Sequence, residues 1–188
     1  ELVGTNPMQY IAGNINSTCF DTSIINIIGH LIPDVSIVDP GVLCSNQGSV
    51  NLNCLNNGIY NDLSWTGSGI IDISLGAINP VLINDSSIVY LNHDSICSSV
   101  DSITIIVDVP TDATVLTNDT NYCENSSIFS PTVVNLGGFW IGQNVDSISG
   151  LITNNLQPNS YSYQYVTINS NNCRDTGSYQ IQIIENND

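Results

Sequence analysis

The sequence has almost no basic side chains. It contains one arginine, Arg174, and no lysine, against 17 acidic residues, which gives a formal net charge of −16. Nucleic acids and anionic lipid headgroups need Lys or Arg to neutralise their phosphates, so we expect neither as a partner. The absence of lysine also excludes a P-loop, a Schiff-base lysine and a lysine–asparagine isopeptide bond, because each requires the missing amine.

Long apolar runs and helical patterns are also missing. No stretch approaches the roughly 18 apolar residues that a membrane-spanning helix needs, and the chain does not start with a basic segment followed by an apolar one. No 3.6-residue periodicity is evident. We therefore expect no membrane insertion and no helical domain.

The residues of familiar catalytic sites do not occur in catalytic patterns. The two histidines, His30 and His93, lie near a segment junction and in a turn, and the G-x-S-x-G pattern of hydrolases is absent. Most aspartates lie in turns and linkers, where a turn-forming role is the default. The sequence predicts no catalytic residue, and we expect a protein that is not an enzyme.

Instead, a short sequence pattern occurs three times in the chain. Cys19, Cys97 and Cys173 stand 78 and 76 residues apart, and each is followed by an aspartate with a hydroxyl residue and then by an Ile/Val-rich alternating run. A fixed period of this length indicates tandem structural repeats. Prolines 33 and 110 stiffen the exits from two of these runs, and we place domain boundaries there.

These boundaries divide the chain into three parts: residues 1–33 as the C-terminal part of a truncated repeat, 34–109 as one repeat and 110–188 as another. The chain opens in the middle of the pattern, so we expect an internal or processed piece of a longer protein. About 45 further residues would complete the first repeat, and they come either from upstream sequence or from another molecule.

About seven short alternating segments per repeat, separated by Asn, Gly and Pro turns, predict an all-β fold of antiparallel β-sandwiches. Trp65 lies 32 residues before its repeat's last cysteine and Trp140 lies 33 residues before its own. One tryptophan at an equivalent position in each repeat indicates a core residue. The alternative is a carbohydrate-binding surface, with exposed rings of Trp140, Tyr161, Tyr163 and Tyr165.

The third repeat carries the clearest resemblance to a known family. Its Gly137-Gly138-Phe139-Trp140, its alternating Tyr161–Val166 strand and its Asn172-Cys173-Arg174-Asp175-Thr176 resemble the PKD-like and immunoglobulin-like repeats. Such repeats are strung in tandem through large cell-surface proteins of Bacteroidetes-type bacteria, including adhesins and gliding-associated proteins. The resemblance implies an extracellular location and a structural or adhesive role.

Six cysteines in an acidic chain that resembles extracellular proteins indicate disulfides, and spacing alone allows 15 pairings. The third repeat contains Cys123 and Cys173 and no other cysteine, so we predict that these two pair and that Cys44 pairs with Cys97 in the second repeat. Closing a loop of about 50 residues would stabilise each repeat by roughly 4 kcal/mol.

Two cysteines stay outside these predicted pairs. The natural partner of Cys19 would be an early cysteine in the missing part of the first repeat. Cys54 alternates in phase with Val50 and Leu52, which predicts a buried apolar residue; a bridge to Cys19 is the alternative.

Calcium is the one ligand that the sequence favours, and no other cofactor is expected. Asp34 with Asp39, and Asp108 with Asp112, lie at the junctions beside extended backbone, and Ca²⁺ prefers carboxylate and carbonyl oxygens. No D-x-D-x-D-G loop is present, so a turn-forming role for these aspartates is the alternative.

Three short motifs predict glycan attachment. Ser95, Ser102 and Ser147 each lie between an aspartate and an isoleucine, which resembles the D-[ST]-hydrophobic O-glycosylation pattern of Bacteroidetes-type bacteria. Chance occurrence in a chain so rich in Ser and Asp is the alternative.

The sequence therefore favours a non-enzymatic extracellular stalk of disulfide-tied repeats. Its expected partners are neighbouring repeats or other copies of itself, with surface glycans as a further candidate. Two alternatives remain: a self-assembling filament subunit joined by strand donation from residues 1–32, and a carbohydrate-binding module.

Overall fold

A computed structural model describes residues 2–13, 20–30, 32–55, 62–124, 129–153 and 156–185. Over these residues the secondary structure consists of β-strands and one 3₁₀-helix, Pro80–Leu82, without an α-helix. Most strand pairs are antiparallel. The predicted all-β class of antiparallel, immunoglobulin-like sandwiches is confirmed. In the described part of the chain, no helix is both long enough and apolar enough to cross a membrane.

The chain groups in space into two compact units. The first comprises Glu1–Pro40, Asn51–Ile78 and Ile88–Thr104, and the second comprises Gly41–Val50, Asn79–Ser87 and Ile105–Asp188. This grouping does not follow the sequence repeats, and the predicted boundaries 1–33, 34–109 and 110–188 stay a prediction. "Second repeat" and "third repeat" below refer to residues 34–109 and 110–188.

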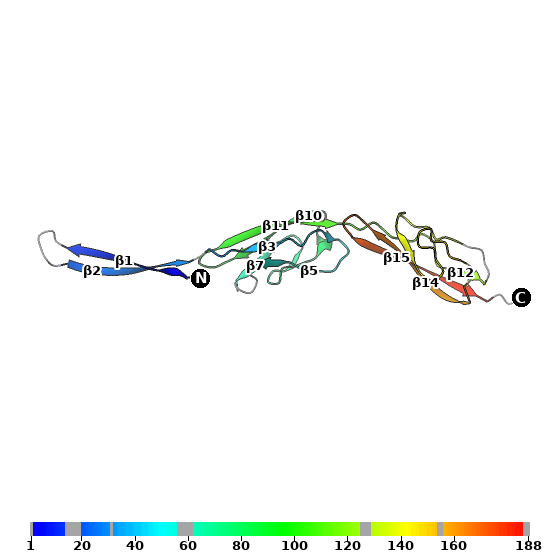
Figure 1. Cartoon of the computed structure of the whole chain (residues 1–188), viewed down its shortest axis with the longest axis horizontal. Helices are drawn as coiled ribbons and strands as arrows, with labels where there is room; N and C mark the ends of the chain where they lie inside the picture. The colour runs from blue at the N-terminus through cyan, green and yellow to red at the C-terminus, as the bar shows by residue number, and fades with distance from the viewer. Residues whose placement is uncertain are drawn as a thin grey trace. The chain divides into compact units, whose positions relative to one another are not determined.

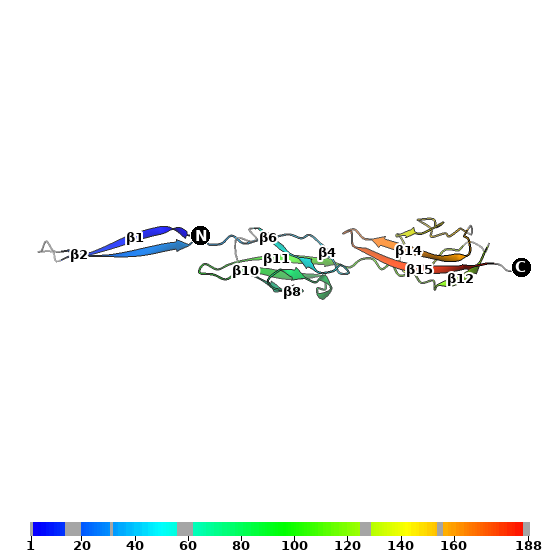
Figure 2. The same cartoon turned by 90° about the horizontal axis from the view of Figure 1, so that it is seen from below.

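The first unit begins with a hairpin. Strands β1 (Leu2–Gly13) and β2 (Phe20–His30) form a two-stranded antiparallel sheet, seen side by side in Figures 1 and 2. Met8 lies opposite Ile25, and Tyr10 lies opposite Ser23.

The second repeat builds three small sheets. One has the order β4-β11-β10-β7, one the order β5-β9-β8, and one pairs β3 with β6. The strands are β3 (Ser36–Val38), β4 (Leu43–Cys44), β5 (Val50–Asn51), β6 (Asn53–Leu55), β7 (Leu63–Gly67), β8 (Ile70–Asp72), β9 (Ala77–Ile78), β10 (Ser86–His93) and β11 (Ser99–Asp108). Alternate residues of β10 and β11 are buried, as expected for sheets with one face in a core.

The third repeat has one four-stranded sheet, ordered β12-β15-β14-β13. Its strands are β12 (Thr120–Cys123), β13 (Phe139–Ile141), β14 (Asn159–Ile168) and β15 (Arg174–Ile184). Strand β12 runs parallel to β15, and the other neighbours are antiparallel. Isolated bridges, Val115–Val133, Phe129–Ile152 and Val145–Ile152, join the segments that face this sheet. The core between them contains Ala113, Trp140, Ile152, Leu156, Tyr163, Tyr165, Tyr179, Ile181 and Ile183.

Both tryptophans lie in the core, with exposed fractions of 3% for Trp65 and 4% for Trp140. The backbone N–H of Trp65 donates to Ile73 O at 2.7 Å, and the backbone N–H of Trp140 donates to Ser147 O at 2.8 Å. Each ring therefore lies under a loop that its own backbone holds in place.

The same loop chemistry recurs in both repeats. Asp72 Oδ1 accepts from the backbone N–H groups of Ser74 and Leu75, and Asp146 Oδ1 accepts from those of Ile148 and Ser149. These hydrogen bonds favour the charged carboxylate and lower the pKa of both aspartates.

Each of these loops ends at a glycine with positive φ. A Cβ on Gly76 would lie 2.7 Å from the Trp65 ring, and one on Gly150 would lie 2.5 Å from the Trp140 ring. Glycine is required here because it adopts the left-handed conformation and leaves room for the indole.

The aspartate that follows the late cysteine of each repeat ties the first segment of the repeat to its last strand. Asp101 Oδ2 accepts from the Ile37 N–H at 2.7 Å, and Asp175 Oδ2 accepts from the Ala113 N–H at 2.9 Å. The repeated aspartate of the sequence thus has a structural role in both sandwiches.

Candidate functional site

The most distinctive site is a covalent junction, which we define as Cys44, Asn46, Asp108, Asn169, Asn171 and Cys173. All six residues belong to the second compact unit. A disulfide joins Cys44 to Cys173 across 129 residues of sequence, with the two Cα atoms 5.4 Å apart. It links the second sequence repeat to the third.

Strand pairing places Cys44 at this junction. The short strand β4 runs parallel to the end of β11, so that Cys44 lies beside Asp108. The Ser45 N–H then donates to Asp108 O at 2.8 Å. Cys44 is therefore held at the point where the last strand of its repeat ends.

A tight turn places Cys173 opposite. Asn169 Oδ1 accepts from the N–H groups of Asn171 and Cys173, each at 3.0 Å, and Asn172 has a φ of 62°. Asparagine tolerates this left-handed conformation and caps such turns with its side chain. The turn carries Cys173 into a fully buried position directly before β15.

Side-chain amides surround the disulfide. Asp108 Oδ2 accepts from Asn169 Nδ2 at 2.9 Å and from Asn171 Nδ2 at 2.8 Å. Asn46 Nδ2 donates to Arg174 O at 2.8 Å. Each of these bonds connects a residue of one sequence repeat with a residue of the other, so the junction combines one covalent tie with several polar ones.

This geometry corrects both predicted pairs. The structure joins Cys44 to Cys173, so it contains neither the predicted Cys44–Cys97 bond nor the predicted Cys123–Cys173 bond. Cys44 lies beside the last residue of β11, whereas Cys97 precedes the first. Ten strand residues at about 3.3 Å each separate the two positions by roughly 30 Å, far beyond the roughly 7 Å that a disulfide allows between Cα atoms.

The same reason applies in the third repeat. Cys123 lies beside Ile184 at the end of β15, and Cys173 precedes the start of that strand. Repeat-by-repeat pairing was wrong because it ignored the parallel register, which places the early and late cysteines at opposite ends of one long strand.

The remaining cysteines differ in their surroundings. Cys54 lies on β6 opposite Ile37, and it is buried, which raises the pKa of its thiol. Cys97 is half-buried and Cys123 is exposed. Cys19 lies outside the described residues, so its pairing stays a prediction.

Of the four aspartates predicted as calcium ligands, Asp108 belongs to the junction, and Asp34, Asp39 and Asp112 lie in segments between strands. Asp112 Oδ1 accepts from both the N–H and the hydroxyl of Thr114, which lowers the pKa of Asp112. Asp34 Oδ1 accepts from the Ser36 hydroxyl at 3.4 Å, and Asp39 is exposed.

Asp108 uses one carboxylate oxygen for the two asparagine amides already described and the other, at 2.9 Å, for the Val109 N–H. Over the described ranges, no three His, Cys, Asp or Glu side chains gather as a metal site would require. Calcium binding stays a prediction.

The three serines predicted to carry glycans are exposed. Ser95 lies in the turn before β11, where its hydroxyl donates to Cys97 O at 3.3 Å. Ser102 lies on β11, and Ser147 lies in the loop over Trp140. Their exposure is compatible with modification, which stays a prediction.

The aromatic residues proposed as a sugar-stacking surface point inward instead. Trp140, Tyr163 and Tyr165 are buried, and the Trp140 and Tyr165 ring centroids lie 5.0 Å apart inside the core. Tyr161 is half-buried and donates from its hydroxyl to Gln157 O. Stacking on a sugar needs an exposed ring face, so these four residues do not form the expected platform.

The β1–β2 hairpin is a second candidate site, because it exposes a row of apolar side chains. Aligning Asp21 of β2 with Asp175 of β15 matches the two hairpins in register, residue by residue. The exposed fractions are 60% for Met8, 68% for Tyr10, 63% for Ile25 and 47% for Ile27, against 0% for Tyr163, 2% for Tyr165, 0% for Tyr179 and 2% for Ile181 at the matching positions.

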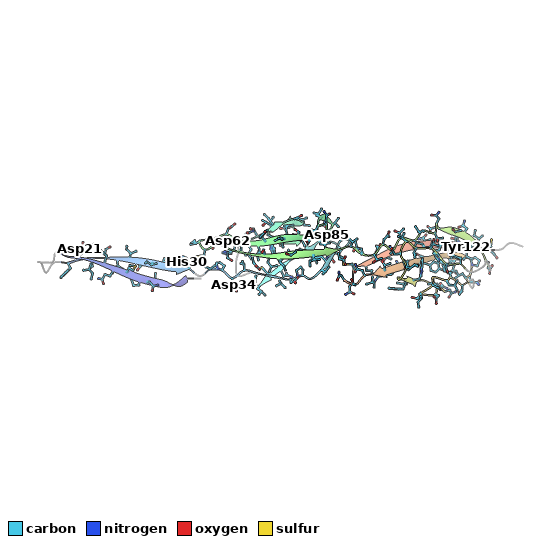
Figure 3. All side chains as sticks on the ribbon, turned by 90° about the horizontal axis from the view of Figure 1, so that it is seen from above. Asp21, His30, Asp34, Asp62, Asp85 and Tyr122 are labelled. Atoms are coloured by element: carbon cyan, nitrogen blue, oxygen red, sulfur yellow. A yellow bond between two sulfur atoms is a disulfide. The ribbon has the colours of Figure 1, made fainter. Side chains whose placement is uncertain are left out.

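Asp21 shows the same contrast. It lies on the hairpin (Figure 3) and accepts from the N–H of its own neighbour, Thr22. Its counterparts Asp101 and Asp175 accept from backbone N–H groups in the first segment of a sandwich, those of Ile37 and Ala113. The hairpin therefore has the sequence of a sandwich's last two strands.

Sequence reasoning missed the asparagines of the junction. The sequence analysis predicted no role for Asn46, Asn169 or Asn171, which form hydrogen bonds across the two repeats. The one indication was their position beside Cys44 and Cys173, which becomes informative only when the register of β4 against β11 is known.

The chain matches no protein-family model and no curated protein. Among solved structures it is similar to the tandem Ig repeats of Dlar, with 13% identity, coverage of 81% of this chain and 98% of that one, and a TM-score of 0.31. It is also similar to human protocadherin-24 EC1-2, with 10% identity, coverage of 81% and 99%, and a TM-score of 0.34.

A third similarity is to a Bacteroides ovatus protein of a mixed-linkage glucan utilization locus, SGBP-B, solved with a mixed-linkage heptasaccharide. The identity is 10%, the coverage is 81% of this chain and 48% of that one, and the TM-score is 0.29. Similarities of this size support no conclusion about ligands or partners.

Proposed function

We propose that this chain is a non-enzymatic structural segment of an extracellular, adhesive surface protein, in which sandwich repeats of the PKD-like type act as a stalk. The observation that carries the proposal is the Cys44–Cys173 disulfide, which ties one sequence repeat to the next. A disulfide of this kind is typical of oxidising, extracellular surroundings.

The junction suits a load-bearing role. Hydrogen bonds such as those of Asp108 with Asn169 and Asn171 yield singly under force, whereas a disulfide does not open without chemical reduction. The net charge of −16 keeps neighbouring chains apart in solution. Repeats tied in series would then span distance without unravelling.

Force spectroscopy on the whole chain, held by its two ends, tests the stalk. The disulfide shortens the path by the 129-residue separation of its cysteines, which at about 3.5 Å per extended residue is roughly 450 Å of chain. We expect the oxidised protein to extend less than the Cys44→Ser/Cys173→Ser variant by that length, and Cys97→Ser to behave as the wild type. Equal extension of the oxidised and double-serine proteins would refute the stalk mechanism.

A second candidate function is that of a filament subunit joined through residues 1–32. The specific observation is the exposed apolar row of β1–β2, whose counterparts in the third repeat are buried. Apolar strands that are left uncovered favour association with another chain.

Light scattering across a concentration series tests the filament. If it forms, Ile25→Asp/Ile27→Asp should abolish growth in mass, while Ile106→Asp, which alters an equally exposed strand residue of β11, should not. A monomeric wild-type protein at all concentrations would exclude the filament.

A further inference from the structure

The exposed apolar row of β1–β2 matches a row of β14–β15 that is buried. In the third repeat the cover comes from the segment that directly precedes the hairpin, which contributes Ala113, Trp140 and Ile152 to the core. We call residues 110–158 the early half of the third repeat and residues 34–85 the early half of the second. A segment of this kind has the apolar face that the row of β1–β2 needs.

Tyr10 shows which kind of early half fits. Its counterpart Tyr165 lies opposite Trp140, and the Tyr165 hydroxyl accepts from the Gly138 N–H at 2.7 Å. A Cβ on Gly138 would lie 2.6 Å from the Tyr165 ring, so this tyrosine requires a glycine two residues before the tryptophan. Tyr10 therefore predicts a Gly-x-Trp sequence in the segment that covers it.

The early half of the second repeat does not meet this requirement. Leu63 stands two residues before Trp65, where the third repeat has glycine, and Trp65 lies opposite Leu91 instead of a tyrosine. A leucine side chain at that point leaves no room for a tyrosine ring. Residues 34–85 therefore do not fit over Tyr10.

Ser23 excludes the early half of the third repeat. It lies opposite Tyr10, as Gly177 lies opposite Tyr165. A Cβ on Gly177 would collide with Ala113 O, so the first segment of the third repeat packs directly on that glycine. The same segment would collide with the side chain of Ser23.

We propose that β1–β2 binds a third early half, a polypeptide segment outside residues 1–188 that has a Gly-x-Trp sequence and a first segment that leaves room for Ser23. A second copy of this chain brings only the two early halves that do not fit. The proposal rests on the proposed role as a repeat segment and names the partner of the exposed hairpin.

Two polar groups of the hairpin bind this partner beside the apolar row. Asp21 accepts a backbone N–H from its first segment, as Asp175 accepts from the Ala113 N–H at 2.9 Å. The Tyr10 hydroxyl accepts from the N–H of the glycine in Gly-x-Trp. These two bonds set the register of the partner on the hairpin, while the apolar row contributes most of the buried area.

Calorimetric titration of the purified whole chain with a synthetic peptide of residues 110–158 tests the fit. The peptide carries Gly138 and Trp140 but packs too closely at Ser23, and its Cys123 is replaced by serine to prevent thiol exchange. Ser23→Gly removes the obstacle and should bind the peptide at least about tenfold more tightly than the wild type. Hydrogen exchange of the β1–β2 amides should slow in the same complex, which locates the binding.

Matched changes control for non-specific apolar binding. Gly138→Leu in the peptide introduces the side chain of the second repeat and should abolish binding to the Ser23→Gly chain. Asp21→Ala in that chain should weaken binding about tenfold, because a backbone N–H of the peptide loses its acceptor. Ile25→Asp should abolish binding, whereas Ile24→Asp, which alters an equally exposed residue on the opposite face of β2, should not.

The proposal is overturned if Ser23→Gly binds the peptide no better than the wild type does, or if the Gly138→Leu peptide binds equally well. It is also overturned if the whole chain alone grows in mass and Ile25→Asp stops this growth, because a second copy would then cover the row. None of these results depends on the Cys44–Cys173 disulfide, so the force measurement on the stalk decides the proposed function independently.

Discussion

Two hairpins of this chain have the same design and opposite surroundings. β1–β2 and β14–β15 pair in matching register, each with an aspartate near the start of its second strand and an alternating apolar row beyond it. In the third repeat this row forms the core, whereas in β1–β2 the matching side chains are exposed. A two-stranded ribbon alone is at best marginally stable in water.

The difference shows that the register and alternation within one hairpin are local properties, whereas the stability of the hairpin depends on what covers its sheet. Strand β15 has β12 on one side, β14 on the other and a Trp140-containing core against one face. Fully burying a large apolar side chain contributes about 1.5–3 kcal/mol. The exposed row of β1–β2 gains little of this contribution in the isolated chain.

The largest expected effect on stability comes from removing the Cys44–Cys173 disulfide, whose second cysteine precedes β15. Removing the Cys44–Cys173 bond by Cys173→Ser should lower the free energy of unfolding by about 4–5 kcal/mol, because the bond closes a very long loop. Cys97→Ser, at the matching position before β11, should leave the stability of the isolated chain unchanged. Urea denaturation of oxidised proteins measures both, and equal losses would contradict the asymmetry.

The next effect compares matched isoleucines. Ile181→Ala should destabilise the third repeat by about 2–5 kcal/mol, because it opens a cavity in a packed core. Ile27→Ala, at the equivalent position of β2, removes a side chain that is already exposed and should change stability by less than about 0.5 kcal/mol. A large loss for Ile27→Ala would mean that the β1–β2 face is covered in solution.

A smaller effect compares matched aspartates. Asp175→Ala leaves the N–H of the buried Ala113 without its acceptor and should cost about 1–3 kcal/mol. Asp21→Ala removes a contact with the adjacent Thr22 alone, so its effect should be within experimental error. Hydrogen exchange at the Ala113 amide provides a local readout: it should speed up in Asp175→Ala and stay constant in Asp21→Ala.

Much of the fold followed from sequence because its determinants are local. The all-β class came from alternation and turn residues, and Trp65 and Trp140 are core residues as their once-per-repeat occurrence indicated. Cys54 is buried, in phase with Leu52. Each of these features depends on neighbours within a few residues or on a simple repeat count.

The cysteine pairing failed because it depends on a register that the sequence does not encode locally. Whether Cys44 meets Cys97 or Cys173 is decided by β4 running parallel to β11, and a two-residue strand has no periodicity from which to read direction. The inward orientation of Tyr163 and Tyr165 was equally undetermined, because alternation alone does not say which face of β14 meets the core.

The smallest expected change in stability at neutral pH comes from two tyrosines of β14, one with a hydrogen-bonded hydroxyl and one without. Tyr165 Oη accepts from the Gly138 N–H at 2.7 Å and donates to Asn135 O at 2.9 Å, so Tyr165→Phe should cost about 1 kcal/mol. The Tyr163 hydroxyl is buried without a hydrogen-bond partner, so Tyr163→Phe should be neutral or stabilising. Thermal unfolding of both variants measures this ranking, with Tyr10→Phe, at the exposed position that matches Tyr165, as the control. A larger loss of stability in Tyr163→Phe than in the other two variants would refute it.

Alkaline pH sharpens the same contrast. Burial raises the pKa of Tyr163 to about 12, while an unfolded tyrosine ionises near 10. The folded chain therefore keeps a proton that the unfolded chain releases, so the stabilising contribution is complete below pH 10 and is lost as pH rises toward 12. Urea midpoints at pH 9 and pH 11 should fall less in Tyr163→Phe than in the wild type. Equal declines would mean that the Tyr163 hydroxyl reaches water in solution, as the ring of the exposed Tyr10 in the β1–β2 hairpin does.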